Sequence, residues 1–283
     1  MMKKEAKPIR LLPAYRHGED TPWGGDALGR LFGLAIPDDR TGEALVFSTL
    51  PGLQSCAEDG RTLEELAGKP LPLLVKLLHA RRTLSVQLHP SDALAPAGRS
   101  GKEEAWLILH AEPGARLVYG LLPGVKLPPR PGADVEACLR WVPVRAGDIL
   151  HIPPGTVHAI GGGIVLLEVQ QASDITYRLW DWGSARPLHW DQALAAISTD
   201  APPPVRQGSL SGVHFGLALL RVQGCMPLPD VGGFQCLTAL GAGHLRYGGE
   251  GIPFDRGDTL FIPEGAGAIQ IEGHCEMVRA WAR

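Results

Sequence analysis

The sequence predicts a mainly β protein with few helices, built from two related β modules of which the second is smaller. The first observation behind this prediction is composition: 36 glycines and 25 prolines make up about a fifth of the 283 residues, against an average of roughly 12%. Such an excess is typical of many turns between short strands and not of helical bundles. The second observation is an internal repeat.

The repeat joins residues 145–160, "RAGDILHIPPGTVHAI", to residues 255–270, "DRGDTLFIPEGAGAIQ". Both copies contain Gly-Asp, an apolar pair and Ile-Pro-x-Gly, and the glycines and proline suit turns that end short strands. Without gaps, His158 of the first copy aligns with Ala268 of the second. We therefore expect His158 to serve chemistry in the first module and the second module to be structural.

Seven short runs have the composition of strands. They are Ala44–Ser48, Leu84–His89, Glu104–His110, Arg116–Gly120, Trp141–Val144, Ile164–Gln170 and Thr176–Trp182. Helix candidates are Thr62–Ala67, Trp190–Ile197 and an ambiguous apolar piece within Lys69–Ala80. A boundary between the modules is predicted near residues 199–209, "TDAPPPVRQGS", where three prolines break any regular pattern.

Charge and cysteine usage narrow the class of protein. The formal net charge is −3 and the basic residues are scattered, which argues against a nucleic-acid or membrane surface and favours a small-molecule partner. No apolar run approaches the ~18 to 20 residues of a membrane span. The five cysteines are widely spaced without a Cys-x-x-Cys pair, so we expect reduced thiols and a cytoplasmic protein. Oligomeric state is left open, as monomer or homo-oligomer.

Residues 84–92, "LSVQLHPSD", place three polar side chains on one face of a strand. Strand alternation puts Ser85, Gln87 and His89 together, and that face either meets water or lines a cavity that holds a metal or a polar ligand. Gln87 and His89 have the spacing needed for two side chains to reach one ion. With Glu104 and His158 they form a candidate set for zinc or another first-row divalent metal.

The run from Gly147 to His158 fits Gly-x5-Pro-x-Gly-x2-His and resembles the second sequence motif of cupins. This resemblance implies a jelly-roll β-barrel whose usual metal site takes one histidine from this motif. We accordingly expect residues 1–200 to form a metal-binding catalytic cupin domain and residues 207–283 a cupin-like β domain without metal ligands.

A longer ordered set of motifs resembles the short bacterial form of the type I mannose-6-phosphate isomerases. The matching stretches are "PWGGDAL" (22–28), "PLLVKLLHARRTLSVQLHP" (72–90), "GKEEAW" (101–106), "AGDILHIPPGTVHAIGGGIVLLEVQQASDITYRLWDW" (146–182), "RPLH" (186–189) and "GDTLFIP" (257–263). The resemblance implies a zinc set of Gln87, His89, Glu104 and His158. It also implies Arg178 as a catalytic arginine and Ser85 as a substrate-binding residue. Some members of the family have a histidine at the position of Gly101.

The resemblance implies interconversion of mannose 6-phosphate and fructose 6-phosphate by zinc-assisted proton transfer through an enediol or enediolate. Such a reaction needs a base and groups that stabilise negative charge on oxygen. Lys102, on the same strand face as Glu104, can contact the substrate, neutralise this charge or exchange a proton, and Glu168 is the alternative base. Arg178 offers a permanently charged fork.

Two other functions remain open from the sequence: another metal-dependent cupin enzyme, such as an iron oxygenase, and a non-catalytic sugar-phosphate-binding cupin. Glu103 is expected to be a solvated neighbour that points away from the site. Several further histidines are interpreted as structural, namely His79, His110, His151, His189, His214 and His244.

Overall fold

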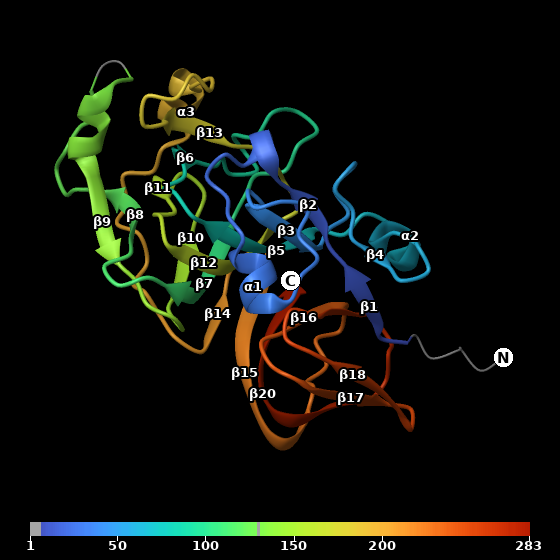
Figure 1. The fold of residues 1–283 in the computed structure, drawn as a ribbon. Coiled ribbons are helices and arrows are strands. Elements are labelled where there is room, and N and C mark those ends of the chain that lie inside the picture. Colours follow the sequence, from blue (N-terminus) through green and yellow to red (C-terminus); the bar gives the residue numbers. More distant parts are fainter. Residues whose placement is uncertain (1–6, 129–130) are drawn as a thin grey trace.

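Antiparallel sheets make up most of the regular secondary structure in the computed structural model, which describes residues 7–128 and 131–283 (Figure 1). The mainly β prediction is confirmed, and the fold is of the cupin-like kind that the repeat motif suggested. Two facing sheets form the first module. The six-stranded sheet runs in the order β10 (Ile149–Ile152), β7 (Glu104–Ala111), β12 (Ile164–Gln171), β5 (Leu73–Ala80), β3 (Glu43–Phe47) and β2 (Ala14–Arg16). The five-stranded sheet runs β13 (Tyr177–Trp180), β6 (Val86–Leu88), β11 (His158–Ala159), β8 (Arg116–Leu121) and β9 (Leu139–Pro143).

A third sheet of nine strands contains the C-terminal module. Its main path is β14 (Ser209–Ser211), β15 (Phe215–Pro227), β20 (Ile269–Ala282), β16 (Gln235–Ala239), β19 (Thr259–Ile262), β1 (Ile9–Leu12) and β4 (Cys56–Ala57), and the hairpin of β17 (Gly243–Tyr247) and β18 (Glu250–Phe254) joins it at β20. Figure 1 shows the blue strand β1 beside these orange and red strands, and Ile9 is paired with Phe261. The C-terminal sheet therefore also uses strands from the first 60 residues, and the division into residues 1–200 and 207–283 stays a prediction.

The repeat seen in the sequence is a repeated turn and strand. The strands β10 and β19 begin and end at equivalent positions of the two copies. Gly147 and Gly257, which precede these strands, have φ values of 90° and 97°, in the left-handed region that glycine adopts without strain. In each copy the following aspartate accepts a hydrogen bond from a backbone N–H three residues before it, Asp148 from Arg145 and Asp258 from Asp255. Both modules thus use the same turn chemistry.

Three α-helices occur in the described part of the chain: α1 (Ala27–Phe32), α2 (Leu63–Ala67) and α3 (Trp190–Ala196), with 3₁₀ turns at Gly18–Asp20 and Ala133–Cys138. The predicted helices near 62–67 and 190–197 are confirmed, and Thr62 starts α2 with a reciprocal capping box to Glu65. Helix α1 was not anticipated. Within residues 7–128 and 131–283, no helix is both long and apolar enough to cross a membrane.

The helix candidate within Lys69–Ala80 is wrong, because residues 73–80 form β5 in the middle of the six-stranded sheet. Every residue of β5 is buried. The reason is that this sheet is covered on both faces, so the strand reads as a continuous apolar run without alternation. One face, with Leu78 and Ala80, packs into the interior of the first module. The other face, with Val75 and Leu77, packs in the same core as Phe261 of the C-terminal sheet.

Phe47 joins the two modules at this second face. Its side chain is fully buried on β3, and its ring lies 5.7 Å from that of Phe234 and 5.8 Å from that of Phe261. The six-stranded sheet is thus held from behind by the C-terminal module, while its opposite face is available for chemistry.

We predict that Phe47→Ala lowers the free energy of unfolding by about 3 to 5 kcal/mol, because it leaves a cavity at the junction. Urea denaturation measures this loss. Leu194→Ala is the control, since Leu194 on α3 is 41% exposed and its truncation is expected to change stability by no more than about 0.5 kcal/mol. Equal losses in the two variants would contradict this role of Phe47.

Candidate metal centre and substrate pocket

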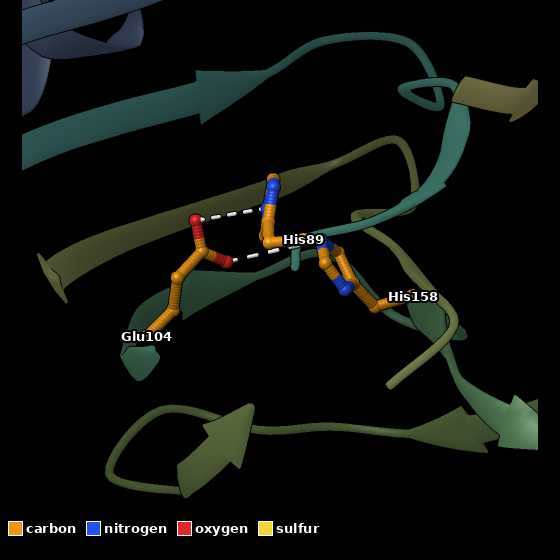
Figure 2. Close-up of side chains that lie close together, drawn as sticks. All are labelled: His89, Glu104 and His158. Carbon is orange, nitrogen blue, oxygen red and sulfur yellow. Dashed lines mark ion pairs between the residues drawn. The ribbon is translucent and has the colours of Figure 1, made fainter. Parts of the chain in front are cut away.

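Four side chains of the predicted metal set come from three strands and converge inside the first module. Gln87 lies on β6 with His89 directly after that strand, Glu104 begins β7, and His158 begins β11. Antiparallel pairing of β11 with β6 sets His158 opposite Gln87. Figure 2 shows the side chains of His89, Glu104 and His158 pointing toward one another, and their candidate ligand atoms all lie within 4.8 Å.

The Glu104 carboxylate is the centre of this cluster. Its Oε1 atom lies 3.2 Å from Nε2 of His89, and its Oε2 atom lies 3.8 Å from Nε2 of His158 (Figure 2). The Lys102 ammonium forms an ion pair with the same carboxylate and lies 3.4 Å from Nε2 of His89. All three charged or chargeable partners of Glu104 are buried. The site therefore concentrates positive charge and nitrogen lone pairs around one carboxylate.

Both imidazoles are oriented by their outer nitrogen. Nδ1 of His89 donates to the backbone carbonyl of Ile175 at 2.6 Å, and Nδ1 of His158 donates to that of Thr156 at 2.9 Å. A proton on Nδ1 leaves the lone pair of Nε2 directed at the cluster, which is the arrangement found in metal-binding histidines.

Burial sets the protonation of the cluster. It lowers the pKa of His158 to about 3, helped by the nearby charge of His89, and burial together with the charge of Lys102 lowers the pKa of His89. Burial alone would raise the pKa of Glu104, but the charge of Lys102 and the contacts with the two histidines outweigh it, so this pKa lies well below its usual value. Neutral imidazoles and an ionised carboxylate are the forms that bind metals.

Gln87 lies next to this cluster. Of the predicted ligands, it alone can present either of two different atoms to the cluster, the oxygen or the nitrogen of its amide. Its Nε2 atom lies 3.4 Å from Nε2 of His158, and its Oε1 atom accepts a hydrogen bond from Oγ of Ser85 at 3.2 Å. The two ends of an amide are interchangeable by a half-turn. After that half-turn Oε1 faces the cluster and the NH2 group donates to Ser85.

The residues present fit a divalent metal. Oε1 of Glu104 pairs with the Lys102 ammonium, but Oε2 is buried without a hydrogen-bond partner among the described residues, and such atoms are rare in proteins unless a ligand or ion satisfies them. Two imidazole nitrogens, a carboxylate and an amide oxygen are a donor set for zinc or a similar ion.

A pocket of about 150 Å³ opens beside the cluster, and it collects the other predicted site residues. Its wall includes Ser85, Gln87, Lys102, Glu168 and Arg178. Gln87 belongs both to this wall and to the metal cluster, so a molecule in the pocket would lie against the metal site. The structure thus brings every predicted site residue into one region.

Arg178, on β13, forms no ion pair with a carboxylate among the described residues. Asp181 is paired with Arg186 at 2.6 Å, and Asp174 pairs with Arg99. The Arg178 side chain donates to the carbonyl of Pro187 at 2.8 Å, while its Nε is buried without a partner among the described residues. This leaves part of the guanidinium for a ligand of the pocket.

Two functional candidates were missed by sequence reasoning, Lys76 and Glu43. Lys76 lies on β5 with its ammonium 3.4 Å from both Glu43 and Glu168, and all three side chains are buried. The available signal was a single lysine inside the apolar run "PLLVKLLHA", because a buried charge needs a partner. It was hidden by the interpretation of this run as an ambiguous helix.

Glu168 differs from the other carboxylates of the pocket in its protonation. Burial and the negative charge of Glu104 raise its pKa, while Lys76 opposes the shift. Its Oε2 accepts a hydrogen bond from the indole of Trp106 at 3.1 Å, and its Oε1 has no hydrogen-bond partner among the described residues. A carboxylate with a raised pKa in a pocket is suited to take up and return a proton.

Glu103 corrects one expectation. It points away from the pocket as strand alternation predicts, but it is 2% exposed instead of solvated. Burial would raise its pKa, yet hydrogen bonds from His151 and from the backbone of Val213 and His214 bring it to about 2. His151 and His214 serve structural contacts here, as interpreted from the sequence. Gly101, just before Lys102, lies so close to the chain after His89 that a Cβ there would be 2.5 Å from backbone atoms, which leaves no room for a histidine.

The fold and this buried His/Glu cluster define a cupin-like β protein with a candidate metal centre. No family model matches the chain. A curated mannose-6-phosphate isomerase from Bacillus subtilis is 31% identical to this chain, in an alignment that covers 96% of this chain and 98% of the Bacillus subtilis sequence. The chain therefore belongs to the mannose-6-phosphate isomerase family.

Solved structures agree with this assignment. The crystal structure of the mannose 6-phosphate isomerase from Bacillus subtilis superposes with a TM-score of 0.86 and 28% identity, covering 97% of this chain and 99% of its own. A mannose 6-phosphate isomerase bound with zinc and yttrium has the same fold, with a TM-score of 0.74, 16% identity, and coverage of 98% of this chain and all of its own.

We predict that the low pKa of His158 makes the metal-free protein sensitive to acid. An unfolded histidine takes up a proton near pH 6.5, but folded His158 stays neutral to about pH 3. Between these values only the unfolded state binds the proton, so stability falls as pH falls. His158→Gln removes this dependence and makes the slope of unfolding free energy against pH shallower by up to about 1.4 kcal/mol per unit.

Urea denaturation between about pH 4 and about pH 7 in the presence of a chelator measures these slopes. His244→Gln is the matched control, because His244 is exposed and its replacement should leave the wild-type slope. A His158→Gln curve parallel to that of wild type would contradict the buried neutral imidazole.

Proposed function

We propose that this protein interconverts mannose 6-phosphate and fructose 6-phosphate, with a zinc ion held by Gln87, His89, Glu104 and His158. Membership in the mannose-6-phosphate isomerase family supports the reaction. The observation that carries the site assignment is the buried Glu104 carboxylate, whose Oε1 pairs with Lys102 and whose Oε2 has no hydrogen-bond partner among the described residues, beside two imidazoles already oriented by their Nδ1 hydrogen bonds. The zinc-bound structural relative supports the choice of metal.

The sugar phosphate enters the pocket beside the cluster. Its phosphate dianion needs cations, and three arginines line the pocket, Arg16, Arg178 and Arg186. Arginine is suited to this task because its planar fork binds phosphate oxygens in pairs. Ser85, which is buried next to Gln87, supplies a hydroxyl at the end of the pocket that faces the metal site. We also place the protein in the cytoplasm, supported by five free cysteines.

The isomerisation of mannose 6-phosphate moves one proton from C2 to C1 and a second from O2 to O1, so that the carbonyl shifts from C1 to C2. When bound, zinc supplies a Lewis acid that polarises the carbonyl oxygen. Glu168 acts as the base that takes the C2 proton and returns it to C1, since its pKa is raised and Oε1 accepts no hydrogen bond from the described residues. Lys102 is already engaged as a cation with Glu104, so it stabilises negative charge on the substrate oxygens together with Arg178.

Lys76 and Trp106 hold this base in place. The Lys76 ammonium lies 3.4 Å from Oε1 of Glu168 and the Trp106 indole donates to Oε2. The Lys76 ammonium also forms an ion pair with Glu43, so one positive charge is shared by two carboxylates. Burial and the charge of Glu104 keep the pKa of Glu168 above its usual value, and the shared Lys76 opposes this shift while holding the carboxylate in place.

We predict that purified protein binds about one divalent metal per chain and converts mannose 6-phosphate to fructose 6-phosphate in a coupled assay. Glu104→Ala and His158→Ala should lose both metal and turnover, because each removes a ligand. Metal analysis and the assay together measure this. His110→Gln, at an exposed position, is the control with unchanged metal and turnover. Zinc-loaded wild type without turnover would refute the isomerase assignment, and unchanged metal in both alanine variants would refute the ligand assignment.

We predict that Glu168→Gln lowers kcat about 10²- to 10⁴-fold, as expected for loss of a general base, while metal content is unchanged. In wild type, the acid limb of kcat/KM should lie above about pH 4.3, the ordinary value for glutamate, because the pKa of Glu168 is raised. Activity is therefore lost as pH falls through that pKa.

Lys102→Met separates the two candidate bases. It should also lower kcat but retain the acid limb, whereas Glu168→Gln should abolish the limb. The control Glu112→Gln, at an exposed position, should behave as wild type. If the limb persisted in Glu168→Gln, the base would be another group.

A further inference from the structure

The side chain of Glu103 connects the strand that carries Lys102 and Glu104 to the C-terminal module. Its Oε1 accepts hydrogen bonds from Nε2 of His151 at 2.7 Å and from the backbone N–H of Val213 at 3.0 Å. Its Oε2 accepts from the backbone N–H of His214 at 2.9 Å and from the Nδ1 of the same residue at 2.8 Å. Four donors therefore surround one buried carboxylate.

Val213 and His214 form the turn between β14 and β15, strands of the C-terminal sheet. The turn approaches Glu103 as closely as glycine allows, since a Cβ on Gly212 would lie 2.6 Å from Oε1 of Glu103. Arg283 holds the turn from the other side, with Nη1 donating to the carbonyl of Gly212 at 2.8 Å. Arg283 therefore holds the turn in place independently of Glu103.

The same turn also contacts the chain segment that leads into Lys102. Nε2 of His214 lies 3.1 Å from Oδ2 of Asp92, and Oδ1 of Asp92 accepts from the backbone N–H of Gly101 at 2.7 Å. On the neighbouring strand, Oε1 of Gln171 accepts from the backbone N–H of Glu103 at 2.8 Å. The backbone from 101 to 103 is therefore held at each residue by groups outside the pocket.

We propose that Glu103 is a positioning residue through which the β14–β15 turn sets the backbone, and hence the metal affinity, of the Lys102–Glu104 segment. Strand alternation sends residues 102 and 104 inward and residue 103 outward, so anchoring the outward side chain fixes the two inward ones. Loss of the anchor leaves buried donors without an acceptor and frees the segment to move. This inference rests on the proposed metal site and explains why a module without metal ligands packs behind it.

The test is the zinc affinity of the full-length protein, measured by competition with a chromophoric chelator. Glu103→Gln keeps the size of the side chain but replaces one acceptor oxygen with an NH2 group that faces N–H donors. We expect about tenfold weaker zinc binding, in the range seen when groups that support metal ligands are removed. Arg283→Met loosens the turn from its far side and should weaken zinc binding in the same direction by a smaller factor. Arg283→Met also tests the proposal if the Glu103→Gln variant does not fold.

Gln235→Leu is the control for general loss of stability. Gln235 is buried on β16 and accepts from Nε of Arg279 at 2.7 Å, so its replacement weakens the C-terminal module without touching the turn. Its zinc affinity should equal that of wild type. Wild-type affinity in both Glu103→Gln and Arg283→Met would overturn the proposal, as would an equal loss of affinity in Gln235→Leu at a matched drop in Tm.

These outcomes are distinct from failure of the proposed function. If wild type binds no zinc, the metal site and the positioning role both fail. If wild type binds zinc and turns over mannose 6-phosphate, and Glu103→Gln and Arg283→Met bind zinc as tightly as wild type, only the positioning role fails.

Discussion

A buried carboxylate, Glu104, is the constraint around which the first module is arranged. Removing such a group from water costs several kcal/mol unless charges and hydrogen bonds compensate. Here Lys102 pairs with Oε1 and the imidazoles of His89 and His158 lie nearby, yet Oε2 has no hydrogen-bond partner among the described residues. The compensation within the chain is incomplete, and the divalent cation that we propose would complete it. Three strands meet at this point: β7 begins at Glu104, β11 begins at His158, and β6 ends directly before His89.

The two faces of the six-stranded sheet make different contacts, one with the pocket and the other with the C-terminal sheet. Along β5 and β12, one set of alternate residues faces the pocket and includes Lys76 and Glu168. The other set, including Val75 and Val169, packs in one core with the C-terminal sheet. The second copy of the repeat has Ala268 where the first has His158. The absence of this histidine and the retention of the turn fit a module that packs behind the six-stranded sheet and has no part in the proposed metal site.

Much of the site could be predicted from sequence because its determinants are local. The two-residue spacing of Gln87 and His89 and the Gly-Asp turn that leads to His158 each place a side chain through backbone geometry alone. Lys76 and Glu103 could not be placed in this way. Lys76 lies in a run without periodicity, since its strand is covered on both faces. The acceptor role of Glu103 depends on donors 48 and 110 residues away in the chain, which no local pattern reveals.

The most direct test of the central claim is anomalous X-ray scattering at the zinc edge from crystals of the zinc-loaded protein. The account predicts one strong peak per chain, within about 2.0 to 2.2 Å of a Glu104 oxygen and of Nε2 of His89 and His158, with Oε1 of Gln87 turned toward it. A peak at Glu103, His151 and His214 instead, or no peak at Glu104, would contradict it.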